Sequence, residues 1–303
     1  MSMPLTIECE GVTKHYPHFQ LQDVNLSFEQ GTVMGLVGPN GAGKSTILRI
    51  IMGLIGPDSG RVKVLGHSMP KDQLAAKRNI GFVAEDMRLY ESENIAFHMD
   101  FIKSIFDSWD DEYAKNLLRR FDLNKDQKVK GMSHGQRVKT TLLLALARRP
   151  NLLVFDEPTT GLDPAVRKEV LDEMMNSLQD ETHSVLFSSH NTLDVEQISD
   201  HITFIYGGRV MESRNKEDFM DGWRRLRLTN MNDTPLPNLT NIKDIQQSGR
   251  LCTVTVNNYE NSIAEQFTDI GLQVNSIERL TLEEIFLANV LSAKNTPKKE
   301  AML

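Results

Sequence analysis

The stretch that most constrains this chain is GPNGAGKST, residues 38–46, which directly follows the apolar run TVMGLVG. It fits the pattern G-x-x-x-x-G-K-[ST], in which a buried strand turns through glycines into a helix. In that arrangement backbone N–H groups turn inward and the positive end of the helix faces the same anion. The sequence therefore predicts a phosphate site made of Gly38, Asn40, Gly41, Gly43, Lys44, Ser45 and Thr46.

The polar residues at the end of this loop predict which phosphates are bound. Lys44 supplies a positive charge to the β- and γ-phosphates of a nucleotide, and the Ser45 hydroxyl is a ligand for Mg²⁺. A glycine-rich turn that only caps an ordinary helix is the alternative reading. The strand before the loop and the helical pattern after it favour the phosphate site.

A second motif, LLVFDEP at residues 152–158, delivers two acids to the end of another apolar run. Asp156 is placed to hold Mg²⁺ through water, and Glu157 to orient and deprotonate a water that attacks the γ-phosphate. Taken alone, the motif also fits an acidic strand-to-turn boundary. Together with the phosphate loop it predicts a nucleoside triphosphatase.

The apolar runs TVMGLVG, NLLVFDE and SVLFSSH predict strands buried on both faces of a mostly parallel sheet, and therefore an α/β fold. Strands are expected at 5–9, 24–28, 32–37, 61–65, 151–155, 184–188 and 202–206. Helices are expected at about 44–54, 92–105, 111–121 and 134–148, and after Asp163.

The order of further motifs resembles that of the ATP-binding cassette (ABC) family of transporter ATPases. MSHGQR stands upstream of LLVFDEP, and PTTGLDP and SVLFSSHN stand downstream of LLVFDEP. The resemblance covers about residues 4–222. It implies the P-loop NTPase fold of ABC ATPases, with a mixed sheet core, an antiparallel β subdomain and a helical subdomain at about 87–148. It also implies a head-to-tail homodimer that sandwiches ATP and Mg²⁺ between its subunits.

The same resemblance assigns roles residue by residue. It implies a catalytic set of Glu157, His190 and Lys44, with His190 as the switch histidine. Tyr16 corresponds to the aromatic residue that stacks on adenine, although a strand-edge tyrosine without a ligand is the alternative. The signature motif and the loop aspartate that communicates across the dimer correspond to Ser133, Gly135, Gln136 and Asp163.

Two positions depart from the usual family pattern. Glu85, in IGFVAEDMRLY, stands where a glutamine usually senses the γ-phosphate, and a carboxylate there is expected to ligate Mg²⁺ unless it is a solvated loop acid. His134 stands where the signature motif usually has glycine. We assign it no metal or proton-transfer role and expect at most an effect of its charge on dimer closure.

The composition indicates the partners and the cellular compartment of this protein. The formal net charge of -7 and the lack of a basic stripe disfavour a nucleic-acid partner, and two distant cysteines fit a reducing cytoplasm. No signal peptide or membrane span is expected. In this family the region 87–120 meets a separate transmembrane permease. Its aromatic residues could form the docking groove or instead fill the core of the subdomain; they include Tyr90, Phe97, Phe101, Phe106 and Trp109. The protein is therefore expected in the cytoplasm, peripheral to the inner face of the membrane.

A turn-rich stretch at 207–240 indicates a domain boundary. The sequence predicts a small α+β accessory domain at 223–292, followed by a disordered tail at 293–303. Within it, Thr281 is predicted to cap a helix, with Glu284 three residues on. An ending of this kind, together with Glu85, resembles bacterial exporters of drugs, antibiotics and polysaccharides.

The leading prediction is thus the ATPase subunit of a bacterial exporter. A soluble mechanical or regulatory ATPase that acts on nucleic acid or ribosomes is the main alternative, disfavoured by the single cassette and the absence of heptads. A small-molecule kinase is disfavoured because Glu157, Asp163 and His190 form a water-activating set. The cargo is expected to be recognised by the permease.

Overall fold

The computed structural model describes residues 4–178, 181–231, 234–237 and 239–295. The chain divides into two compact units, residues 1–213 and 214–303. The division lies upstream of the boundary at 222/223 that the sequence suggested, because the helix at 216–222 belongs with the second unit.

The first unit contains an antiparallel four-stranded sheet in the order β2-β1-β4-β5. Its strands are β1 (Leu5–Tyr16), β2 (Phe19–Glu29), β4 (Ser59–Val64) and β5 (His67–Met69). In β2 the buried residues Leu26 and Phe28 alternate with exposed ones, as expected for a sheet with one face on the core. β1 continues well past its predicted end through register shifts near Gly11.

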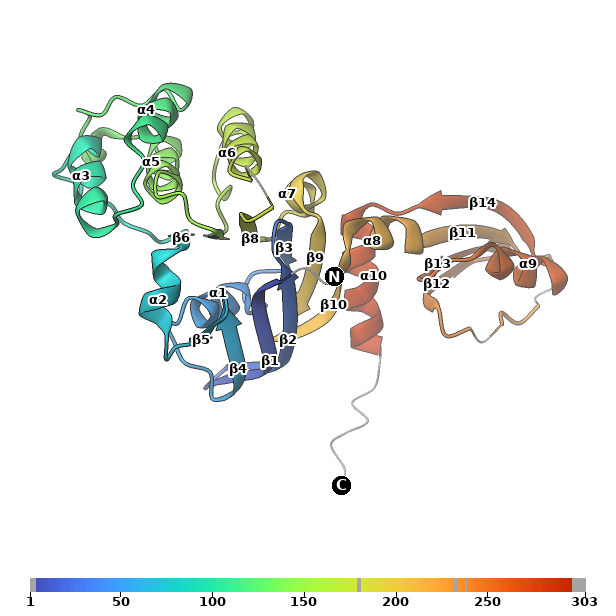
Figure 1. The fold of residues 1–303 in the computed structure, drawn as a ribbon. Coiled ribbons are helices and arrows are strands. Elements are labelled where there is room, and N and C mark those ends of the chain that lie inside the picture. Colours follow the sequence, from blue (N-terminus) through green and yellow to red (C-terminus); the bar gives the residue numbers. More distant parts are fainter. Residues whose placement is uncertain (1–3, 179–180, 232–233, 238, 296–303) are drawn as a thin grey trace. The chain divides into compact units, whose positions relative to one another are not determined.

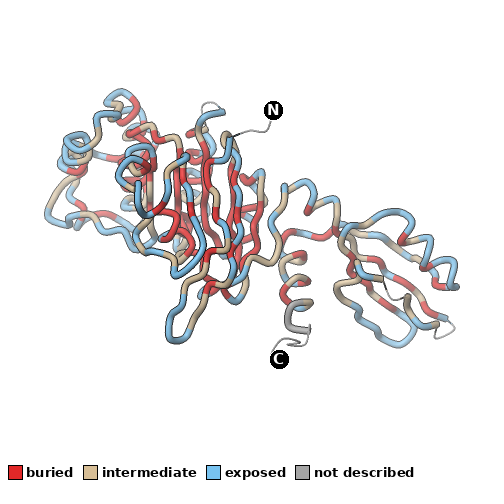
Figure 2. The backbone as a smooth tube through the Cα atoms, turned by 60° about the horizontal axis from the view of Figure 1, so that its bottom comes forward, coloured by how far each residue is buried: buried red, intermediate tan, exposed pale blue. Residues whose placement is uncertain are grey.

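A six-stranded sheet in the order β10-β9-β3-β8-β7-β6 forms the rest of the β framework (Figure 1). The pairs β3–β8, β3–β9, β7–β8 and β6–β7 are parallel. All residues of β3, β7 and β8 are buried, and red segments accordingly run through the middle of this unit in Figure 2. The bounds are β3 (Val33–Val37), β6 (Ile80–Val83), β7 (Leu152–Asp156), β8 (Ser184–Ser189), β9 (His201–Tyr206) and β10 (Arg209–Asn215).

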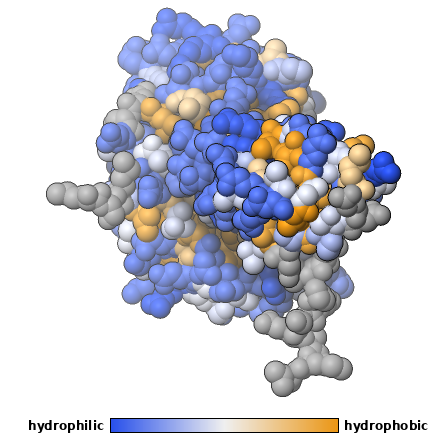
Figure 3. Space-filling view, turned by 90° about the vertical axis from the view of Figure 1, so that its right-hand side faces the viewer, coloured by the Kyte–Doolittle hydropathy of each residue, from blue (hydrophilic) through white to orange (hydrophobic). Residues whose placement is uncertain are grey.

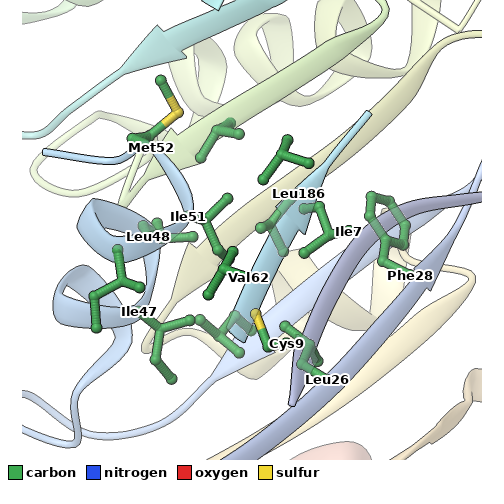
Figure 4. Packing of buried hydrophobic residues seen from close by; sticks show 14 of the residues in the cluster. Ile7, Cys9, Leu26, Phe28, Ile47, Leu48, Ile51, Met52, Val62 and Leu186 are labelled. Atoms are coloured by element: carbon green, nitrogen blue, oxygen red, sulfur yellow. The ribbon is translucent and has the colours of Figure 1, made fainter. Parts of the chain in front are cut away.

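Helix α1 (Lys44–Ile51) packs in the core between the two sheets (Figure 4). Its apolar residues Ile47, Leu48 and Ile51 belong to one buried cluster with Ile7 of β1 and Leu186 of β8. Burying such side chains contributes about 1.5–3 kcal/mol each. This packing fixes the N-terminus of α1 at the end of β3, where the phosphate loop lies.

The first unit contains further helices. They are α2 (Gln73–Arg78), α3 (Ile95–Ile105), α4 (Asp111–Arg120), a short 3₁₀ turn (Val129–Gly131), α5 (His134–Leu146), α6 (Pro164–Asn176) and α7 (Thr192–Ile198). Helices α3, α4 and α5 fall within the range predicted for a helical subdomain and lie together in Figure 1. Among the described residues, none of the helices combines the length and apolar character needed to cross a bilayer.

The second unit is an antiparallel sheet in the order β12-β13-β11-β14 with its own hydrophobic core. That core includes Leu226, Leu228, Val254 and Phe267. On the surface, Figure 3 shows patches of hydrophobic residues between hydrophilic ones. The bounds are α8 (Lys216–Gly222), β11 (Arg224–Thr229), β12 (Ile242–Ser248), β13 (Leu251–Val256), α9 (Asn261–Asp269), β14 (Gln273–Arg279) and α10 (Leu282–Asn295).

The predicted tail at 293–303 needs a correction, because residues 293–295 belong to α10. Residues 296–303 lie outside the described part of the chain. Thr281 and Glu284 meet at the start of α10 as expected, since the Thr281 backbone N–H donates to Glu284 Oε2 at 2.9 Å.

Candidate functional site

The functional side chains converge because four parallel strands end at the same sheet edge. In the order β3-β8-β7-β6, Val37 pairs with Ser189, Asp156 with Ser188, and Val83 with Phe155. The phosphate loop follows β3, His190 follows β8, Glu157 follows β7 and Glu85 follows β6. The carboxyl edge of a parallel sheet is where such folds bind their ligands.

The phosphate loop takes backbone conformations that favour glycine. Gly41 has a φ of 78° and Gly43 a φ of 111°. A Cβ at Gly43 would lie 2.6 Å from Leu21 Cδ2, whereas a Cβ at Gly41 would meet no atom within 4 Å. The loop is thus packed against β2 on one side and open on the other, as a phosphate cradle requires.

Lys44, the first residue of α1, is 5% exposed. Its Nζ donates to the carbonyl oxygens of Gly38 at 2.7 Å and Pro39 at 3.3 Å. The same Nζ lies 2.9 Å from Glu157 Oε1 and forms an ion pair with it. The ammonium group therefore stands at the mouth of the loop, with the carboxylate as a counter-ion that a phosphate can replace.

Asp156 and Ser45 form the second pair at this edge. The Ser45 hydroxyl donates to Asp156 Oδ1 at 3.0 Å, and the Ser188 hydroxyl donates to the same oxygen at 2.7 Å. Ser188 also accepts the backbone N–H of Glu157 at 3.0 Å. Ser188 thus fixes both acids at the end of β7, a role that no motif in the sequence indicated.

This oxygen set fits Mg²⁺. Among the described residues, no cluster of three or more His, Cys, Asp or Glu side chains is present. Mg²⁺ does not need such a cage, because it is usually held by one or two carboxylates together with water and substrate phosphates. A hydroxyl and a carboxylate 3.0 Å apart beside the phosphate loop match that donor set.

Glu157 is the most heavily contacted side chain of the site. Its Oε2 accepts hydrogen bonds from His190 Nδ1 at 2.7 Å and from Thr160 Oγ1 at 3.1 Å. Its buried Oε1 faces Lys44 Nζ at 2.9 Å. Burial raises the pKa of Glu157, but Lys44 and His190 lower it by more, so the pKa lies below its ordinary value. Glu157 is therefore ionised at neutral pH, with Lys44 at one oxygen and His190 and Thr160 at the other.

A cavity of about 390 Å³ opens over the phosphate loop. The predicted residues Asn40, Gly41, Gly43, Lys44, Ser45 and Thr46 line it, together with Glu85 and Glu157. His18 and Phe19 also line this cavity, although no motif pointed to them beyond their closeness to Tyr16. The exposed carboxyl side chain of Glu85 is thus at the same cavity as the phosphate loop.

Tyr16 lies beside this cavity and is not part of its lining. It is 43% exposed at the end of β1, and its ring stacks on that of Phe19 at 6.4 Å between centroids. Phe19, in turn, fills the space over Gly43. The two rings together offer an aromatic platform next to the phosphate loop.

The signature residues are separate from the Lys44 cavity. Ser133 caps α5 by accepting the N–H of Gln136 at 3.2 Å, and Gln136 Oε1 accepts the N–H of Ser133 at 3.0 Å. A Cβ at Gly135 would lie 3.1 Å from Val166 Cγ1, so the start of α5 packs on α6. Asp163 caps α6 by accepting the N–H groups of Ala165 and Val166. None of these residues lines the cavity over the phosphate loop.

Comparisons with known proteins agree with this geometry. Residues 21–160 match the family model described as ABC transporter. The chain is 28% identical to the ABC transporter ATP-binding protein YtrB of Bacillus subtilis, over 88% of this chain and 92% of that protein. It is 31% identical to a probable sulfate/thiosulfate import ATP-binding protein of Chlorella vulgaris, over 72% of this chain and 94% of that one.

A third relative is the lantibiotic transport ATP-binding protein SrtF of Streptococcus pyogenes, 34% identical over 63% of this chain and 82% of that protein. Among solved structures, the ATP-binding subunit of an ABC transporter superposes with a TM-score of 0.65 at 26% identity, covering 71% of this chain and 92% of that one. A dimeric ATP-binding cassette bound to ADP and Pi superposes with a TM-score of 0.63 at 22% identity, covering 69% and 98%.

The sheet order, the phosphate loop and these relatives agree on one assignment. The predicted P-loop fold, with a mixed sheet core, an antiparallel sheet and helices, is confirmed. The chain belongs to the ATP-binding proteins of ABC transporters and is an ATP hydrolase of that family.

Proposed function

We propose that this protein is the ATP-hydrolysing subunit of a bacterial ABC exporter. It forms a head-to-tail homodimer that closes on two ATP molecules and drives a separate membrane permease at the inner face of the membrane. The observation that carries the proposal is the convergence of Lys44, Glu157 and His190 within hydrogen-bond or ion-pair distance at one sheet edge. The dimer is supported by the signature residues lying outside the lining of the cavity over the phosphate loop of their own chain.

The proposed roles follow from the contacts. Lys44 exchanges Glu157 for the β- and γ-phosphates, which leaves Glu157 to orient a water and accept its proton. His190 holds Glu157 through Nδ1 and turns its other nitrogen outward to the γ-phosphate. Ser45, Asp156 and Glu85 are the residues that would hold Mg²⁺, which neutralises charge on the phosphates when bound. Tyr16 and Phe19 stack on the adenine.

The substitution Glu157→Gln tests this assignment. An amide side chain at this position cannot accept the proton of water, so ATP turnover should fall by about 10²–10⁴-fold while ATP still binds. Steady-state phosphate release and equilibrium binding of a fluorescent ATP analogue measure the two effects. Turnover within a few-fold of the unmodified protein would remove Glu157 from the role of general base.

The permease would dock on the helical part of the first unit. An apolar groove of about 440 Å³ is lined by Phe82, Tyr90, Phe101 and Phe106 among others. Tyr90 and Phe101 are 61% and 45% exposed, while Phe106 and Trp109 are half-buried. The sequence-based alternative, in which these aromatics fill the subdomain core, therefore fits the second pair better than the first.

The transport role has a direct test. We expect the tagged protein to co-purify with a polytopic membrane protein and to lose it on Phe101→Asp, which places a charge in the groove, while the ATPase activity of the isolated subunit persists. Co-purification with nucleic acid or ribosomes would favour a mechanical ATPase. One relative is named for lantibiotic transport and another for sulfate/thiosulfate import, and the features of this chain that support export are Glu85 and the second unit.

A further inference from the structure

His134, the residue that replaces the usual glycine of the signature motif, makes a contact that glycine cannot make. Its Nε2 lies 3.0 Å from the carbonyl oxygen of Thr160, in the turn between β7 and α6. A carbonyl only accepts, so Nε2 carries the hydrogen and donates it. The imidazole also packs beside Gly161, where a Cβ would lie 3.5 Å from Nε2.

Thr160 continues this contact toward the hydrolytic site. Its hydroxyl donates to Glu157 Oε2 at 3.1 Å, the same oxygen that accepts from His190. One residue therefore joins the first residue of α5 to the catalytic carboxylate within one chain. His134, Thr160, Glu157 and Glu85 also line a single cavity of about 230 Å³.

We propose that His134 is a positioning residue for hydrolysis, which sets the place of the Glu157 carboxylate through Thr160. The start of α5 carries the signature motif, so a movement of this helix is passed to Glu157 by the hydrogen bond from His134. In the proposed dimer this motif faces the nucleotide held by the other subunit, so the link lets one nucleotide site adjust the other. This inference rests on the proposed function of Glu157.

The proposal requires that the donor, and not merely the bulk of the side chain, matters. His134→Ala removes the donor, whereas His134→Gln keeps an N–H at a similar reach. We expect kcat to fall about 2- to 10-fold in His134→Ala, the rate equivalent of one hydrogen bond, with KM for ATP unchanged. His134→Gln should restore most of the rate. His67→Ala, in β5 of the antiparallel sheet, is the matched control and should leave kcat unchanged.

A double-mutant cycle tests the path through Thr160. Thr160→Val removes the hydroxyl that reaches Glu157, so adding His134→Ala should cost little further rate. If the rate losses of Thr160→Val and His134→Ala multiply in the double mutant, the link from His134 to Glu157 is overturned. A His134→Gln variant that is as slow as His134→Ala, with an unchanged melting temperature, would also overturn the link. Neither result affects the proposed role of Glu157. Full turnover by Glu157→Gln would overturn both the link and the proposed role of Glu157, so the two failures are distinguishable.

Discussion

At the scale of single residues, Glu157 at the sheet edge has a strained backbone conformation. Glu157 has a φ of 52°, a left-handed conformation that costs a residue other than glycine about 1–3 kcal/mol. The hydrogen bonds from its backbone N–H to Ser188 and from His190 and Thr160 to its side chain hold it there. This strain is located at the carboxylate that we propose as the general base.

The lowered pKa of Glu157 predicts a pH-dependent stability. A carboxyl group whose pKa is lower in the folded protein stabilises it fully above its unfolded-state pKa, and this contribution is lost as pH falls through the folded-state pKa. In the absence of nucleotide, the unfolding free energy of the unmodified protein should therefore exceed that of Glu157→Gln, and by most at about pH 6–7. This difference should shrink as pH falls below the ordinary glutamate pKa near 4.5. Urea unfolding across this range measures the gap; a gap that widens with acidity would contradict the assignment.

Ser188→Ala is expected to destabilise the protein by about 1–3 kcal/mol, because it leaves the buried N–H of Glu157 without an acceptor. It also removes one donor to Asp156. Urea unfolding is the measurement, with Ser108→Ala at an exposed position as the control. Equal effects of the two substitutions would show that water replaces the Ser188 hydroxyl.

Elements differ in how well the sequence indicates them. Strands β3, β7 and β8 were predicted because both of their faces are buried, so apolar residues fill most of their length. The edge strand β6 was missed because only four residues, Ile80–Val83, form it, and an acidic loop follows them. That strand positions Glu85, so the place of this acid at the cavity required the structure.

Helix α4 offers a test of how a cap supports the helical subdomain. Asp110 accepts the N–H of Tyr113 at 2.8 Å and pairs with Arg149 at 3.1 Å, and these contacts hold its pKa below the ordinary value. Asp110→Ala should cost about 1 kcal/mol or more, whereas Asp110→Asn should keep the cap and cost less. Thermal unfolding compares the two with Glu112→Ala, an exposed control. Equal losses for Asn and Ala would assign the effect to charge alone.

Over the whole molecule, the motifs predicted which residues gather and not what holds them. The phosphate loop, Asp156, Glu157 and His190 follow from patterns along the chain, because they lie at the carboxyl ends of the parallel strands β3, β7 and β8. Phe19, Ser188 and the link from His134 to Thr160 depend on contacts between distant segments. Such contacts leave no periodic signal, so the sequence suggested only an effect of charge for His134.

The two units predict where the chain can be divided. Fragment 1–213 should fold and bind ATP, because it holds both sheets and every residue of the cavity over the phosphate loop. Fragment 1–222 adds α8 without the unit to which it belongs, and thereby exposes Phe219, which is fully buried in the whole chain. We expect it to aggregate more than fragment 1–213 in light scattering. Equal behaviour of both fragments would place α8 with the first unit.

The ion pair of Lys44 affects which anions can bind at the phosphate loop. Its ammonium group is already matched by Glu157 and two carbonyl oxygens, so an arriving anion has to compete with an internal partner. We expect sulfate or free phosphate, with a single phosphate-sized group, to gain little from that exchange. A nucleoside triphosphate brings several phosphates and, in the proposed complex, a base for Tyr16 and Phe19. We therefore expect the resting protein to discriminate against small anions.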